Sequence, residues 1–316
     1  MPSCPLCGSV AVKHLDSVCV SDLARIYHRA YGINVAKFFG GPEVSLLLCD
    51  SCDLRFYHPL VTGDVEFYEE LSVHEDYYMD DKPEFTFAKA LISADDIVLE
   101  IGGGHGAFGK SLATQNYTGL EFNRSAVAKA EQKGVRMANE SVKEHAQHNR
   151  ERYDVVCSFQ VLEHVSDPRD FLEAAMHCLK PGGVLIISVP SYDSFLRTAP
   201  NLVSNMPPHH VTLWSDRALF NIADILGARV TSMQHERIAP YHFSWFVQCA
   251  IYSLLRRRSA RRPALVDFGW RTRFLWKLSL LFTRMLQPLF ALLKPRLPDE
   301  YLPTGHTVTV VLRKTQ

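Results

Sequence analysis

The segment Val98–Gly109, which reads VLEIGGGHGAFG, constrains the fold of this 316-residue chain more than any other. A short apolar run ends in Glu100 and passes directly into Gly102, Gly104 and Gly106, the pattern E-x-G-x-G-x-G. Alternate glycines let a backbone turn tightly after a strand and approach a ligand closely, and the helix that follows offers unpaired N–H groups. The segment therefore predicts a strand, a ligand-binding loop and a helix in an α/β sheet.

Two carboxylates decide which ligand the loop suits. Gly104, Gly106 and Gly109 also match the G-x-G-x-x-G pattern of dinucleotide-binding folds, which is a weak signal by itself. Glu100 would repel a pyrophosphate but suits an ammonium or sulfonium charge. Glu121 ends the next apolar run, where a carboxylate can bind both hydroxyls of a ribose. Together these residues favour an adenosyl ligand with a cationic tail.

The segment resembles the class I S-adenosylmethionine-dependent methyltransferases, which carry an acidic residue at the Glu100 position and a ribose-binding acid at the Glu121 position. The resemblance continues in RYDVVCSF at 152–159, QVLEHV at 160–165 and KPGGVLIISVP at 180–190. A dinucleotide-dependent Rossmann enzyme is the main alternative, but it does not explain the LKPGG turn. The resemblance therefore implies that the chain is a methyltransferase, an enzyme that uses S-adenosyl-L-methionine.

The expected fold is α/β, a Rossmann-like seven-stranded methyltransferase sheet with a small N-terminal zinc-binding module and a helical insertion before the last strand. From Ile97 onward, short apolar runs alternate with helical stretches, as in βαβ units. In the family the last strand is antiparallel. The expected strands are Val98–Ile101, Thr118–Glu121, Gly134–Met137, Val155–Phe159, Val184–Val189, Arg229–Gln234 and Thr307–Leu312.

The composition and these motifs divide the chain into four parts. We expect a zinc-ribbon-like module at 1–60, a linker and helix at 61–95, the methyltransferase domain at 96–239 and 304–316, and a basic amphipathic helical insertion at 240–303.

Two C-x-x-C pairs lie in the first part, Cys4 with Cys7 and Cys49 with Cys52. Two such pairs can complete a tetrahedral four-thiolate site of the kind that holds structural Zn²⁺. Asp53 stands where a second glycine is expected after the second pair. A redox pair and plain buried cysteines are the alternatives. With four protein ligands the metal has no open position for chemistry, so we expect it to serve folding or docking.

The insertion is basic although the whole chain has a formal net charge of zero. Between Tyr241 and Pro303 there are eleven Lys or Arg and three Asp or Glu. An apolar face follows the arginine run, and Pro288 should kink any continuous helix there. Packing on the enzyme or on a dimer partner, contact with an anionic membrane surface through 271–295, and nucleic-acid binding are the alternatives, the last being the weakest.

The resemblance implies a cofactor site and a nearby acceptor site. The cofactor-binding residues expected from it are Glu100, Gly102, Gly104, Gly106, Glu121, Phe159 and Gln160, with Ser141 as a candidate near the adenine. The candidate catalytic residues are Glu163, His164 and His210, since a carboxylate or imidazole there could accept a proton from the acceptor. His210 lies in a loop that precedes a helix with Ser215 as its expected N-cap.

The predicted function is transfer of a methyl group from S-adenosylmethionine to an oxygen, nitrogen or carbon of a small metabolite. A sugar or sugar nucleotide in glycan or secondary-metabolite synthesis is the favoured acceptor class. The alternatives are an RNA methyltransferase and a catalytically inactive binding protein with the methyltransferase fold. The N-terminus shows no apolar secretion signal, so we expect a cytoplasmic protein, either free or peripheral at the inner membrane surface.

Overall fold

The central element of the fold is a seven-stranded sheet with the strand order β10-β11-β8-β7-β4-β5-β6. The computed structural model describes residues 2–73, 79–239, 242–256, 264–293 and 303–315. The strands are β4 (Val98–Ile101), β5 (Tyr117–Leu120), β6 (Met137–Ala138), β7 (Tyr153–Phe159), β8 (Leu179–Pro190), β10 (Ala228–Arg237) and β11 (Thr304–Lys314). β11 runs antiparallel to both of its neighbours, which confirms the predicted sheet.

The strand positions agree with the sequence-based expectation, whereas some ends differ. β10 and β11 are longer than predicted because their shared ladder continues past the apolar runs. β8 begins earlier than predicted because Leu179 already pairs with Tyr153 of β7. β6 is the opposite case, since only Met137 and Ala138 pair with β5. Gly134, predicted as the start of this strand, has a φ of 79° and lies in the turn before it.

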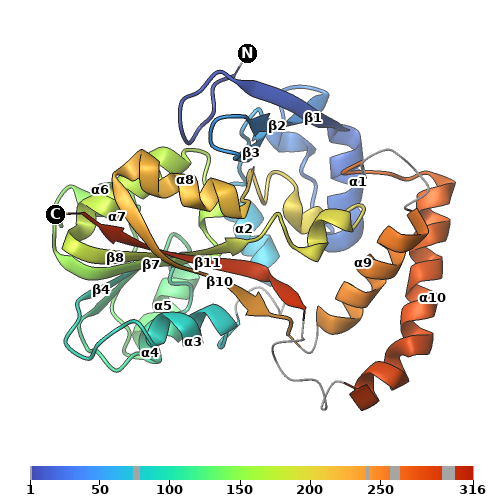
Figure 1. Ribbon diagram of the computed structural model, residues 1–316. Coiled ribbons are helices and arrows are strands. Elements are labelled where there is room, and N and C mark those ends of the chain that lie inside the picture. The colour runs from blue at the N-terminus through green and yellow to red at the C-terminus, as the bar shows by residue number, and fades with distance from the viewer. Residues whose placement is uncertain (1, 74–78, 240–241, 257–263, 294–302, 316) are drawn as a thin grey trace.

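Helices cover both faces of this sheet (Figure 1). On one face lie α3 (Pro83–Lys89), α4 (Ala107–Lys110) and α5 (Arg124–Gln132), and on the other α6 (Val142–Ala146), α7 (Pro168–Cys178) and α8 (Asp216–Leu226). Successive strand residues point to opposite faces, so Val98 joins the core on the first face and Leu99 the core on the second. Ser215 caps α8 as predicted, because its hydroxyl accepts a hydrogen bond from the Ala218 N–H.

The N-terminal part forms a second, antiparallel sheet in the order β1-β2-β3-β9. Its strands are β1 (Val12–Cys19), β2 (Glu43–Cys49), β3 (Arg55–His58) and β9 (Thr212–Leu213), and it is accompanied by α1 (Val20–Tyr31) and α2 (Val65–Ser72). β9 belongs to the segment between β8 and α8. Two residues from the second half of the chain therefore extend the N-terminal sheet, and this places the 209–214 segment against it.

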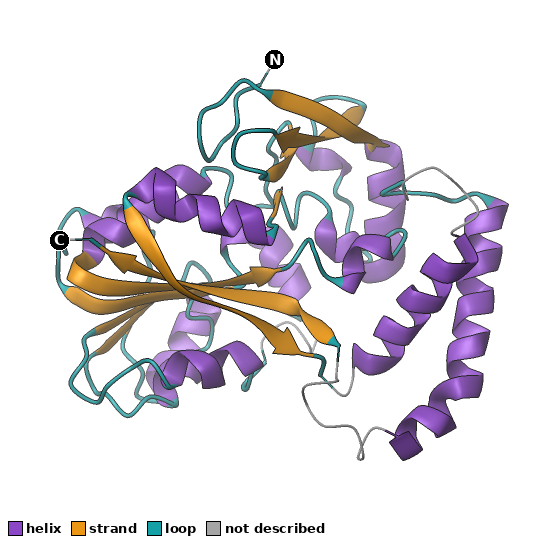
Figure 2. Cartoon of the chain, in the orientation of Figure 1, coloured by secondary structure: helices purple, strands orange, loops and turns teal. Residues whose placement is uncertain are grey.

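The insertion between β10 and β11 contains two helices, α9 (Phe243–Arg256) and α10 (Trp270–Leu293), which lie side by side at one edge of the molecule (Figure 2). α10 does not end at Pro288 but continues to Leu293. The arginine run at 257–262 and the end of the predicted 271–295 contact region lie outside the described residues. Within the described ranges no helix is both long and apolar enough to cross a membrane. The described residues also form the short 3₁₀ helices η1 (Ala36–Phe38), η2 (Leu162–His164), η3 (Phe195–Thr198) and η4 (Val203–Asn205).

Candidate active site

The glycine loop has the backbone geometry that its sequence predicts. Gly102, Gly104 and Gly106 have φ values of 79°, 51° and 78°, a region that side chains disfavour. A Cβ atom at Gly102 would lie 2.3 Å from the Val161 side chain. Gly106 is the N-cap of α4, and a Cβ atom there would lie 2.9 Å from the Ala130 side chain. Gly102 and Gly104 therefore shape the turn of the loop itself, whereas Gly106 permits close packing behind it.

The two predicted acids lie beside this loop, and one of them is hydrogen-bonded to its backbone. Glu121 accepts hydrogen bonds from the backbone N–H of Gly104 at 3.0 Å and of Asn123 at 2.8 Å. Glu100 is buried and accepts a hydrogen bond from the Tyr117 hydroxyl. Burial raises the pKa of Glu100 to about 7. A bound cation beside Glu100 would stabilise its ionised form.

One cavity of about 1260 Å³ connects this loop with the predicted acceptor site. Its lining includes all but one of the predicted cofactor and catalytic residues: Glu100, Gly102, Gly104, Glu121, Ser141, Phe159, Gln160, Glu163, His164 and His210. Gly106, packed behind the loop, is the one left out of this lining. Pockets for a single small molecule commonly measure about 300–1,000 Å³. This cavity therefore has room for a cofactor and an acceptor together.

The residues at the carboxyl end of β7 form the middle of the cavity. The Phe159 ring packs on Phe85 and Phe108, with centroids 5.0 and 4.8 Å away. Gln160 has a φ of 59°, and its side-chain amide donates to the Glu84 carboxylate at 3.3 Å. A non-glycine residue in this conformation is uncommon. The turn after β7 thus aims the next residues into the cavity.

Glu163 is the most unusual polar residue of the cavity. It is buried, and neither carboxylate oxygen has a hydrogen-bond partner in the described structure. Its Oε1 lies 3.9 Å from Nε2 of His164 and 4.0 Å from Nε2 of His210. Burial raises the pKa of Glu163 to about 8. A buried carboxylate without a donor is costly, which points to a ligand that supplies one.

Three histidine rings stand beside Glu163. The centroids of His164 and His209 are 4.6 Å apart and those of His209 and His210 are 4.5 Å apart. His164 Nδ1 bonds the His209 carbonyl oxygen at 2.7 Å, so the proton lies on Nδ1 and Nε2 carries the lone pair. Burial lowers the pKa of His164 to about 4 and lowers the pKa values of His209 and His210 as well. One ring nitrogen from each of the three lies within 4.8 Å of the others, close enough to hold a metal ion.

Several cavity residues were not among the predicted site residues. Tyr68, on α2, has a buried hydroxyl without a hydrogen-bond partner among the described residues, and its ring centroid lies 5.8 Å from that of His164. At the far end, Glu236, His242 and His306 bring one ligand atom each within 4.8 Å of the others. The sequence signal for Tyr68 was the aromatic and acidic segment after residue 60. Nothing in the sequence pairs Glu236 with His306, because β10 and β11 meet only through the sheet.

The four predicted metal ligands come together in the N-terminal part. The Sγ atoms of Cys4, Cys7, Cys49 and Cys52 lie within 4.8 Å of one another. The Gly8 N–H donates to the Cys4 carbonyl and the Asp53 N–H to the Cys49 carbonyl, both at 2.9 Å. Asp53 has a φ of 65° and so takes the same left-handed position as Gly8. Two equivalent turns thus direct four thiols to one point, an arrangement that fits a tetrahedral Zn²⁺ ion.

The chain resembles known proteins over the part that carries this cavity. A family model described as a methyltransferase domain matches residues 72–233. The ubiquinone biosynthesis O-methyltransferase of Serratia proteamaculans is 38% identical over 102 residues, and that of Cronobacter sakazakii 36% over 99 residues. These alignments cover 30% and 29% of this chain and only 42% and 41% of the two relatives.

A solved S-adenosylmethionine-dependent methyltransferase of Mesorhizobium loti has 12% identity and a TM-score of 0.47. The match covers 74% of this chain and 99% of that one.

Proposed function

Since this chain belongs to the methyltransferase domain family, we propose that it transfers a methyl group from S-adenosylmethionine to a hydroxyl oxygen of a small-molecule acceptor. One observation carries this proposal: a single cavity joins the glycine loop and the Glu121 carboxylate to the partnerless carboxylate of Glu163. The oxygen is favoured over nitrogen or carbon because the relatives are named O-methyltransferases and because a hydroxyl must lose a proton.

The cofactor fits the residues at one end of the cavity. Glu121 would bind the ribose hydroxyls, since its carboxylate lies at the cavity wall beside Gly104. Glu100 would face the cationic end of the cofactor, and Ser141, which lines the same cavity, is the candidate near the adenine. When bound, S-adenosylmethionine supplies an electrophilic methyl group on its sulfonium. The chain then has to hold the acceptor in line with that methyl group and exclude water.

Glu163 is the residue that we assign as the proton acceptor. The acceptor oxygen forms a bond to the methyl carbon while the carbon–sulfur bond breaks with its electron pair remaining on sulfur, and the hydroxyl proton moves to the Glu163 carboxylate. A pKa of about 8 suits this role near neutral pH. His164 and His210 flank the carboxylate and position the acceptor hydroxyl.

The acceptor class is the finer part of the proposal. The relatives are named for ubiquinone biosynthesis, so a hydroxylated aromatic ring is the acceptor that we favour. The sugar or sugar nucleotide expected from the sequence has no counterpart in the names of these relatives. Phe159 with its two packed neighbours, together with Tyr68 and Trp245, lines the cavity with aromatic surface, which suits a flat ring.

Two measurements test the proposal. Calorimetry of the purified protein should detect S-adenosylhomocysteine binding, and Glu121→Ala should weaken it by about tenfold or more through loss of two charge-assisted hydrogen bonds. Incubation with methyl-labelled cofactor and a metabolite extract, followed by mass spectrometry, should then give an O-methylated product. A protein that binds no S-adenosylhomocysteine, or that labels only nitrogen or carbon, would contradict the proposal.

We further propose that the four-cysteine site holds one structural Zn²⁺. Support comes from the two matched turns and from the burial of Cys4, Cys49 and Cys52 in the same core as Trp214 and α8. The metal would thereby stabilise the segment that carries His210.

A further inference from the structure

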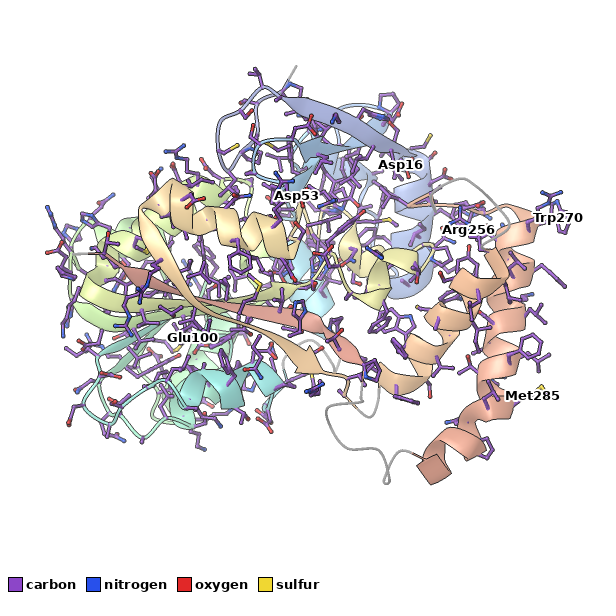
Figure 3. All side chains as sticks on the ribbon, in the orientation of Figure 1. Asp16, Asp53, Glu100, Arg256, Trp270 and Met285 are labelled. Carbon is purple, nitrogen blue, oxygen red and sulfur yellow. The ribbon has the colours of Figure 1, made fainter. Side chains whose placement is uncertain are left out.

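Helix α10 packs with its small hydroxyl residues inward and with several of its large apolar residues outward. Thr272, Ser279 and Thr283 are buried, with Ser279 fully so. The exposed fractions of Trp270 and Met285 are 73% and 67%, and Figure 3 shows both pointing away from α9. A helix on a water-soluble protein normally turns its large apolar side chains toward the core. Small residues in the seam between helices are instead typical of helices surrounded by lipid.

On the side of α10 that faces α9, the polar groups and the aromatic contact are made without the outward apolar residues. The Ser279 hydroxyl donates to the Trp276 carbonyl at 2.8 Å, and the Thr283 hydroxyl donates to the Ser279 carbonyl at 2.9 Å. The Trp276 ring meets Tyr252 of α9 edge-on at 5.3 Å between centroids. The hydroxyls of Ser279 and Thr283 are thus satisfied within α10 and that of Thr272 by Asp267, and the outward residues are not needed to hold the helix pair together.

The outward residues form one continuous face. With 3.6 residues per turn, Trp270, Phe274, Leu281 and Met285 fall within an arc of about 60°, nearly opposite the buried hydroxyls. Phe274 and Leu281 are 57% and 54% exposed. On the same count, Arg273, Lys277 and Arg284 follow along one side of this arc. We call the four apolar and three cationic residues the outer face of α10. It is an apolar stripe with a cationic edge, the pattern of a helix that lies in a membrane interface.

The charge of this face favours an anionic occupant. α9 and α10 contain Arg and Lys but no Asp or Glu in their sequences. Asp267, just before α10, is engaged in the turn that starts the helix, because it accepts hydrogen bonds from the Gly269 N–H and the Thr272 hydroxyl. A second copy of the chain would bring like charges together, whereas anionic lipid headgroups would pair with the cations.

The N-terminal end of α9 also lines the active-site cavity. Trp245 of α9 and His242 just before it contribute to the cavity wall, and the Phe195 ring packs edge-on against Trp245 with centroids 5.7 Å apart. The helix that pairs with α10 is therefore part of the cavity wall.

We propose that the outer face of α10 docks this protein on an anionic membrane surface. The four apolar side chains enter the boundary between headgroups and acyl chains, and the three cations contact the headgroups. This inference concerns a partner of the insertion and does not depend on methyl transfer.

Vesicle co-sedimentation of the full chain tests the proposal without cofactor or acceptor. The protein should bind vesicles of phosphatidylglycerol and phosphatidylcholine, and bind vesicles of phosphatidylcholine alone much less. Phe274→Ser with Met285→Ser should weaken binding by about tenfold or more, because two apolar side chains lose their burial in lipid. Lys277→Glu with Arg284→Glu should also weaken vesicle binding. The loss should be largest at low salt, where the attraction between charges is least screened.

The matched control is Phe220→Ser on α8, which removes an aromatic side chain of similar exposure (50%) outside the insertion and should leave vesicle binding unchanged. Unchanged S-adenosylhomocysteine binding would show that the α10 variants fold. Equal binding of the wild type and the Phe274→Ser, Met285→Ser variant, or no binding to anionic vesicles, would overturn the proposal. Light scattering distinguishes a further outcome. If the wild type is a dimer and this variant is a monomer, the outer face of α10 binds a second copy of the chain instead of a membrane.

Discussion

The Ser215 hydroxyl donates a hydrogen bond to the Asp53 carboxylate, across 162 positions in the sequence. Asp53 closes the second cysteine turn, and Ser215 caps α8. The Asn221 side chain, nearly two turns further along α8, donates to the Cys52 carbonyl at 3.1 Å. The proposed metal site is therefore tied to the helix that follows the histidine segment. These hydrogen bonds link the structure of the cysteine turn to that of α8, which directly follows the segment carrying His210.

Loss of the metal should therefore impair the active site as well as the N-terminal sheet. We expect about one zinc per chain by elemental analysis, as the four-ligand site implies. Cys4→Ser with Cys49→Ser should abolish metal binding, lower the thermal midpoint and reduce methyl transfer. Cys19→Ser, at an exposed cysteine outside the cluster, is the control and should change none of these. Zinc retained by the double variant would refute the assignment.

Gly102→Ala should damage the cofactor loop through a steric clash rather than through backbone strain alone. Gly102 and Gly134 share a φ of 79°, but only Gly102 has a neighbour at the Cβ position, the Val161 side chain at 2.3 Å. We expect Gly102→Ala to weaken S-adenosylhomocysteine binding in calorimetry by about tenfold or more. Gly134→Ala carries the same strain without the clash, so equal losses in both variants would contradict this explanation.

The methyl-transfer rate should depend on the ionisation of Glu163. The ionised carboxylate is the active form, so the rate should rise with pH through about 8. Glu163→Gln should lower kcat by about 10²–10⁴ and remove this rise. Glu173→Gln, on the exposed side of α7 where Glu173 pairs with Arg169, is the control. A Glu163→Gln enzyme with near-normal kcat would exclude Glu163 as the proton acceptor.

The same carboxyl should also make folding stability depend on pH. Burial raises the pKa of Glu163 from 4.5 to about 8, so the folded protein binds the proton more tightly than the unfolded chain does. The stability contributed by the protonated form is complete below about pH 4.5 and is lost as pH rises through about 8. Urea unfolding of wild type and Glu163→Gln at pH 5 and pH 9 should show a smaller loss for the variant. An identical loss in both proteins would show that the carboxyl is not buried in this way.

Much of the cofactor end could be predicted from the sequence because its determinants are local. Gly102 and Gly104 adopt positive φ, and Glu121 follows its strand directly, so the chain order itself places them at one edge of a parallel sheet. The two cysteine turns could also be predicted from the sequence, because each turn positions its own two thiols. Asp53 replaces the glycine that is expected after the second C-x-x-C pair. Asp tolerates the left-handed conformation that this position requires, so the turn still forms.

The sequence by itself determined where most strands lie, the glycine loop, its acids and the two cysteine turns, because each depends on neighbours a few residues away. Tertiary structure decided the rest. It brought His210 to 4.0 Å from Glu163, joined β9 to the N-terminal sheet, and placed Glu236 beside His306. It also decided which side of α10 is buried. Periodicity shows that a helix has an apolar face, but only packing decides whether that face meets protein or remains exposed.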